Sequence, residues 1–244
     1  MKSKKKRTIH TARTMMLSEL SQVMDHNVEG VEFSEIMNAN VSNKLSSSNL
    51  IQTNRHLKQL YSFDNNDILF KSFRHYWQLS NNVNRGILTL LFALTNDYLL
   101  SESIDVVIST EIGRKVAIET LGENIERYHP GRYSDNTRRS AAQNIASSWK
   151  QAGYIEGRIK NIRTDANPDY TTVSFALLLS YINGDRGEFI LSSKWVKALA
   201  LNTEELRDLI KEAAKRDMLQ YQHAGSVTII SFDKQLKLIE YNGK

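Results

Sequence analysis

The chain has 244 residues, of which 41% are hydrophobic and 24% charged, a composition typical of a globular protein of one large or two modest domains. It contains no cysteine, which excludes disulfides, thiolate zinc sites and cysteine nucleophiles and predicts a cytoplasmic protein. The longest apolar run, 87–94, is far shorter than the ~20 residues of a membrane helix, and the basic N-terminus lacks the apolar core of a signal peptide.

Positive charge is concentrated in two segments. The formal net charge is +5, and residues 1–7 contain five basic and no acidic residues. Residues 129–163 contain seven basic and two acidic residues, so the rest of the chain sums to −5. Such clustering indicates a localised anionic partner. A solvated tail and one charged helix face would produce the same distribution, and charge alone does not separate the two interpretations.

Residues 1–67 are predicted to form an N-terminal helical domain. It begins with a basic arm, followed by a helix over about 11–25 and a short helix containing Phe33 and Ile36. A third helix places Gln52 and Arg55 on the face opposite Leu57, so the segment resembles a helix-turn-helix. The polar stretch 63–67 is the predicted boundary to a second domain, 68–244.

Residues 68–128 are predicted to be a layer of central helices. Apolar residues recur at helical spacing from Phe70 to Trp77, fill 87–94, and continue through Ile112 to Val116. These residue types have no chemistry beyond packing, so this layer is expected to join the two ends of the chain.

The basic segment after Pro130 predicts a helix followed by a β-hairpin. Ser134 is a predicted N-cap, with Asp135 in the first turn. The inward face contains Ala142, Ile145, Ala146 and Trp149, and the outward face contains Asn136, Arg139, Gln143, Ser147 and Lys150. Arg138 falls toward the inward edge. A strand at 158–163, a turn at 164–169 and a return strand at 170–175 complete a predicted winged helix that would face a phosphate backbone.

The last third repeats this order with mixed charge. A helix is predicted over 173–182, and Asn202 and Glu205 occupy capping-box positions of another helix. Residues 218–232 form a predicted hairpin that turns near Gly225. Acidic and basic residues alternate on the outer helix face, which favours a structural or protein-facing role for this unit.

Sequence motifs of catalysis are absent. There is no phosphate-binding G-x-x-x-x-G-K-[ST] loop and no G-x-G-x-x-G, and the six histidines are scattered without a metal-binding spacing. The chain is therefore predicted to be a non-enzyme without cofactor or metal. The candidate DNA contacts are Lys4, Lys5, Lys6, Arg7, Gln52, Arg55, Asn136, Arg139, Gln143, Lys150, Arg158, Lys160 and Arg163.

The order of four segments resembles the BrxA family of BREX phage-defence systems. The segments are LSSSNLIQTNRHLKQLYSF, NRGILTLLFALTNDYLLSESIDVVI, YSDNTRRSAAQNIASSWKQAGYIEG and MLQYQHAGSVTIISF. His223 stands where the family often has arginine. The resemblance implies helical domains of winged-helix character, double-stranded DNA binding and a role in phage resistance. It also implies methyltransferase, ATPase and phosphatase-like partners.

Two other functions are compatible with the same sequence. The chain could be a protein-interaction adaptor within a defence complex, which the acidic central helices and the mixed-charge C-terminal unit favour. It could also be a free-standing transcriptional regulator, although no dimerisation helix is evident. A DNA-binding, non-catalytic defence component explains the basic arm and the basic hairpin best.

Overall fold

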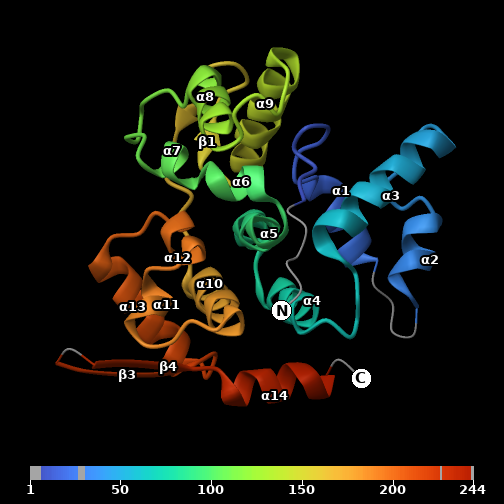
Figure 1. Cartoon of the computed structure of the whole chain (residues 1–244). Coiled ribbons are helices and arrows are strands. Elements are labelled where there is room, and N and C mark those ends of the chain that lie inside the picture. The colour runs from blue at the N-terminus through green and yellow to red at the C-terminus, as the bar shows by residue number, and fades with distance from the viewer. Residues whose placement is uncertain (1–6, 27–30, 226, 243–244) are drawn as a thin grey trace.

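The computed structural model describes residues 7–26, 31–225 and 227–242 and is mainly helical, with two small antiparallel hairpins. Figure 1 shows the N-terminal helices on one side of a central pair, α4 and α5, with the α8–α9 unit above and the α10–α13 unit opposite. The buried hydrophobic side chains form one cluster that extends through these groups. Mainly helical architecture with small hairpins was predicted from the sequence and is confirmed.

The N-terminal region contains α1 (Leu17–Asp25), α2 (Phe33–Asn38) and α3 (Ser47–Tyr61). Helix α1 begins later than the predicted residue 11 because Met16 has a left-handed backbone with φ 55°, which interrupts the helix. Helix α3 begins at a conventional cap, in which Ser46 Oγ accepts a hydrogen bond from the backbone N–H of Asn49.

Residues 68–128 contain α4 (Ile68–Leu79), α5 (Asn82–Asn96), α6 (Tyr98–Glu102), α7 (Ile104–Ile108) and α8 (Ile118–Tyr128), of which α8 packs with α9 and not in the central pair. The apolar run 87–94 is buried throughout in α5, as predicted. The predicted helical continuation to Val116 is wrong. Residues 109–117 are not helical and Ile112 is 67% exposed, because this segment runs out to pair with a hairpin described below.

The basic segment forms α9 (Asp135–Gln151), followed by β1 (Ile155–Glu156) and β2 (Ile162–Arg163), which pair with each other. The predicted return strand at 170–175 is wrong, because those residues begin α10 (Tyr170–Asn183). Asp169 caps this helix by accepting hydrogen bonds from two backbone N–H groups, and burial of the helix among its neighbours outweighs the β-propensity of its first residues.

The C-terminal region contains α11 (Glu188–Leu191), α12 (Lys194–Ala198), α13 (Thr203–Lys215), β3 (Gln220–Ala224), β4 (Val227–Ser231) and α14 (Asp233–Asn242). The capping box of Asn202 and Glu205 is present at α13, and β3 pairs with β4 in the predicted hairpin. Both predictions are confirmed.

Two close contacts connect parts of the chain that are far apart in sequence. Phe63 packs at 5.3 Å between ring centroids against both Phe33 and Phe70, on either side of the predicted boundary near residue 67. Gly86 of α5 lies so near α9 that a Cβ there would meet the carbonyl oxygen of Gln151 at 2.6 Å. The division into domains at 67 stays a prediction.

Candidate nucleic-acid interface

Helix α9 is fixed to the protein by its inward face. Ala142, Ile145, Ala146 and Trp149 are all buried, as the sequence predicted. The indole Nε1 of Trp149 donates to Ser103 Oγ at 2.8 Å, and its ring packs edge-on against Tyr154. The cap at Ser134 is also present. The opposite face of the helix is therefore held in a defined orientation toward solvent.

The outward face of α9 carries the polar residues that the sequence placed there. Asn136, Arg139 and Gln143 are exposed. Lys150, nearer the C-terminal end, is only partly exposed and turns toward the adjacent hairpin. Its Nζ donates to Asn161 Oδ1 at 3.1 Å and approaches the carbonyl oxygen of Arg158 at 3.5 Å. Lys150 thus connects the helix to the hairpin and is less available to a ligand than Arg139.

The β1–β2 hairpin is held along the outer edge of β2 by residues 113–116. Asn161 adopts a left-handed backbone with φ 49° near its turn, and its carbonyl oxygen accepts from Val116 N at 2.8 Å. Lys115 forms a bridge with Ile162 on the edge of β2 away from β1. The tip of the hairpin, with Arg158 and Lys160, remains exposed beside α9.

Arg163 does not belong to this exposed surface, and its placement among the wing contacts is wrong. Its side chain is buried, with 4% exposure, and its guanidinium donates to the backbone carbonyl oxygens of Val107, Tyr154 and Thr164. Burial lowers its pKa. Arg163 therefore fixes β2 to α7, and three of the five guanidinium donors are used by backbone carbonyls of the protein itself.

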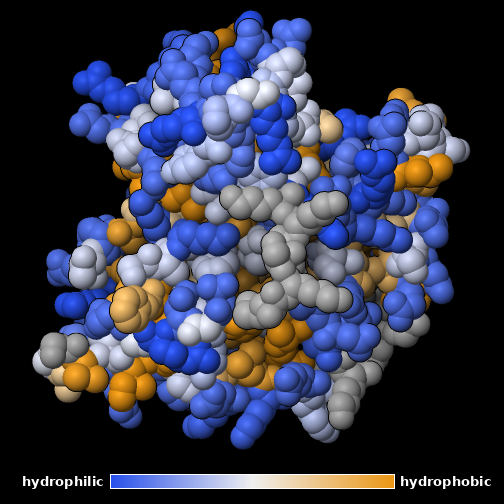
Figure 2. All heavy atoms as spheres, in the orientation of Figure 1, coloured by the Kyte–Doolittle hydropathy of each residue, from blue (hydrophilic) through white to orange (hydrophobic). Residues whose placement is uncertain are grey.

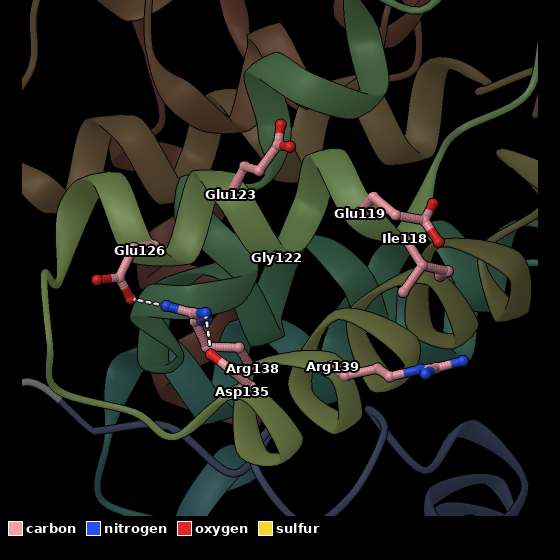
Figure 3. Close-up of a pocket in the computed structure, with 8 residues that line it drawn as sticks. All are labelled: Ile118, Glu119, Gly122, Glu123, Glu126, Asp135, Arg138 and Arg139. Carbon is pink, nitrogen blue, oxygen red and sulfur yellow. Dashed lines mark hydrogen bonds and ion pairs between the residues drawn. The ribbon is translucent and has the colours of Figure 1, made fainter.

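Arg138 clamps the start of α9, as its inward position predicted. It pairs with Glu126 of α8 and with Asp135, and Figure 3 shows this group on one side of a pocket of about 420 Å³ between the two helices. A hydrogen bond from Gly131 N and the bond from Arg138 lower the pKa of Glu126. In the same view Arg139 extends away from the clamp, so the two adjacent arginines have different surroundings.

Charge around α9 is mixed at close range. Glu119 and Glu123 of α8 line the same pocket as Arg139. Arg114 and Lys115, which sequence analysis did not select, are exposed on the segment that runs along β2. The sequence feature that could have identified these two residues is the turn at Gly113, after which a short basic stretch leads into α8. Acidic and basic side chains therefore share the α8 side of α9, whereas the exposed hairpin tip and the segment along β2 carry Arg158, Lys160, Arg114 and Lys115.

The other candidate contacts lie outside this surface. Gln52 and Arg55 are exposed on α3, and Arg7 is exposed at the start of the described chain. Burial, together with Arg13 and Arg55, lowers the pKa of His56, which indicates positive potential around α3. Lys4, Lys5 and Lys6 lie outside the described residues. Within the described residues, the main helix contact of α3 is with α5.

A buried cluster that the sequence did not reveal joins the N-terminal segment to α9. His10 Nδ1 lies 2.8 Å from Asp97 Oδ2, and His10 Nε2 lies 2.9 Å from Ser148 Oγ. This is the residue set of a hydrolase triad. However, Ser148 has no exposure, and its Oγ also accepts from Met15 N and donates to the Asn144 carbonyl. These contacts assign the cluster a structural role.

Comparison with known proteins gave no relative. No protein-family model, curated protein or solved structure matches the chain. Among residues 7–26, 31–225 and 227–242, no group of three or more histidines and carboxylates could hold a metal ion. In the same part of the chain no single helix has the length and apolarity needed to cross a membrane, and only the bent pair Asn82–Asn96 and Tyr98–Ile108 passes that test together.

Proposed function

We propose that the chain binds double-stranded DNA, without catalysing a reaction, through the outward face of α9 and the tip of the β1–β2 hairpin. The observation that carries the proposal is that Arg139 is exposed on a rigidly held helix whose C-terminal end, at Lys150, contacts the hairpin that carries the exposed Arg158 and Lys160. Basic side chains on a fixed helix and hairpin suit two neighbouring stretches of phosphate backbone.

The order of elements supports this proposal. The chain runs through α7, the segment that Lys115 bridges to β2, α8, α9 and then the β1–β2 hairpin. This is the order of a winged helix, and in it α9 would be the recognition helix. Asn136 and Gln143 give this helix few base-reading groups, so we infer binding with little sequence preference. The clamp of Arg138 and the tether of Lys150 hold the surface ready before DNA arrives.

The proposal is tested with Arg139→Ala combined with Lys160→Ala. If five to eight phosphates are neutralised, log affinity falls with log salt at a slope of about −5 to −7, and removing two contacts reduces the slope by about 2. Because both side chains are exposed, each change alters stability by less than ~0.5 kcal/mol. Duplex binding is measured by fluorescence anisotropy across a salt series.

Arg207→Ala combined with Lys215→Ala is the matched control. These residues are exposed on α13, in the corresponding C-terminal unit, and their removal changes the net charge equally. The control is expected to retain the parental salt slope. Equal losses in the two double variants, or a flat salt dependence of the parent, would contradict binding through α9 and the hairpin.

A role in BREX defence is a further part of the proposal, and it rests on the resemblance to the BrxA family alone. It places the protein in the cytoplasm with methyltransferase, ATPase and phosphatase-like partners. Deletion of the gene in its host is expected to lower phage resistance, and complementation with the Arg139→Ala, Lys160→Ala variant is expected to fail. Unchanged plaque counts after deletion would remove this part of the proposal.

Exposed apolar side chains favour a protein-interaction adaptor as the second candidate function. Apolar surface is visible over the β3–β4 hairpin in Figure 2, where Val227 and Ile229 are 58% and 52% exposed. The two residues alternate with buried Thr228 and Ile230, so they share the outer face of β4. Substituting both by serine should leave DNA binding intact, while an adaptor would lose its partner in co-purification.

A further inference from the structure

A second polar cavity lies away from α9 and its hairpin. It has a volume of about 560 Å³ and is lined by the last turn of α3, the junction of α5 and α6, and the start of α12. Three basic side chains from distant parts of the sequence, Arg7, Lys58 and Lys194, reach it. Its volume falls in the range of pockets that take small molecules.

The carboxylates of this cavity have other partners. Asp67 caps the N-terminus of α4, accepting a hydrogen bond from a backbone N–H at 3.0 Å. Asp97 is held by His10 at 2.8 Å, and Glu102 lies 2.7 Å from His129 Nε2. Within the described residues no ion pair joins any of the three basic side chains to a carboxylate. The three basic side chains therefore line the cavity without a direct ion pair from the described residues, alongside the three carboxylates.

Lys194 is the most enclosed of the three basic groups. Its Nζ donates to the Leu94 carbonyl oxygen at 2.7 Å and lies 3.3 Å from Ser101 Oγ, and both of these acceptors are neutral. Burial lowers the pKa of Lys194 to about 8, so the amine is still mostly protonated at pH 7. An ammonium group has three N–H donors, and these contacts use two.

Capping of the C-terminal end of α5 explains the position of Lys194. Lys194 satisfies a carbonyl group in the last turn of that helix, a common role for lysine. That role gives no reason for Arg7 and Lys58 to line the same cavity. An anion with several acceptor oxygens would use the third donor of Lys194 and pair directly with all three basic groups.

We propose that this cavity binds a small molecule through its phosphate or pyrophosphate group, with Arg7, Lys58 and Lys194 as the anion-binding residues. This function is additional to DNA binding, since no residue of the cavity belongs to α9 or to the β1–β2 hairpin. Phosphates of DNA share the same chemistry, so the test separates the two sources.

The test is calorimetric titration of the full chain with pyrophosphate in magnesium-free buffer at pH 7, with sodium chloride matching the ionic strength. Lys58→Met and Lys194→Met are expected to weaken binding at least tenfold. Lys197→Met is the matched control, because this exposed lysine lies on the same helix α12 and pairs with Asp105 outside the cavity. It should bind pyrophosphate as the parent does. If Lys194→Met fails to fold, Lys58→Met and Arg7→Met decide the result.

The remaining arms separate this proposal from the DNA-binding one. The Arg139→Ala, Lys160→Ala variant should bind pyrophosphate normally, and a short duplex should not displace it. Absence of saturable binding, or parental affinity in the Lys58→Met and Lys194→Met variants, would overturn the site. Displacement by duplex, with weaker duplex binding in the cavity variants, would instead assign the cavity to DNA. If the protein binds pyrophosphate but not duplex, the proposal for this cavity holds and the DNA-binding proposal fails.

Discussion

Replacement of Arg163 by methionine separates a structural arginine from a DNA-binding one. The guanidinium forms three hydrogen bonds to backbone carbonyls and lies 5.1 Å from the centroid of the Tyr154 ring. Hydrogen bonds of charged groups contribute about 1.5–3 kcal/mol each, but dehydrating an unpaired guanidinium costs several kcal/mol. The carbonyl oxygens of Val107 and Tyr154 also accept hydrogen bonds from the backbone N–H groups of Thr110 and Thr164, so they still have a donor when the guanidinium is removed.

The balance of these effects is a loss of about 2–3 kcal/mol in the free energy of unfolding for Arg163→Met. Arg158→Met is the matched control in the same hairpin, and its exposed side chain should cost less than ~0.5 kcal/mol. Urea unfolding followed by circular dichroism measures both. Equal stabilities of the two variants, with a salt slope for duplex binding that becomes shallower in Arg163→Met, would show that Arg163 contacts phosphate and that its burial is misassigned.

Two further predictions concern stability. Gly86→Ala should destabilise the protein by about 1–2 kcal/mol, because overpacking against the Gln151 carbonyl outweighs the better helix propensity of alanine. Gly122→Ala, in α8 with open space around it, should instead stabilise by about 0.5–1 kcal/mol; equal effects in chemical denaturation would refute the close contact. Because the pKa of Lys194 is lowered from 10.5 to about 8, the unfolded chain binds more protons between these values, so stability rises with pH there. Relative to Lys194→Met, the parent should gain about 1–3 kcal/mol between pH 7.5 and 10, and a constant difference would argue against a buried amine.

Sequence reasoning succeeded where the determinants are local. The cap at Ser134, the inward position of Trp149 and the capping box of Asn202 follow from residues within one or two helical turns, and all are present. The outward position of Arg139 follows from the same periodicity. Helix periodicity also placed Arg138 nearer the protein than its neighbour, and the clamp with Glu126 agrees.

The errors arose where distant segments decide the structure. Strands of two residues carry almost no periodicity, so the partner of 162–163 was misassigned to 170–175. The burial of Arg163 depends on backbone carbonyls of Val107 and Tyr154, which leave no mark in the sequence. Likewise, no local pattern indicates that Arg7, Lys58 and Lys194 line one cavity.

The contact between His10 and Ser148 has a consequence for the order in which the protein is made. The two residues are separated by 138 positions, and the hydroxyl of Ser148 also binds the backbone of Met15. At about 5–20 residues per second, the ribosome needs on the order of 7–28 s to add the intervening chain. Throughout that interval the segment before α1 lacks its buried partner on α9. The first part of the chain to be synthesised therefore reaches its final packing only after α9 has emerged.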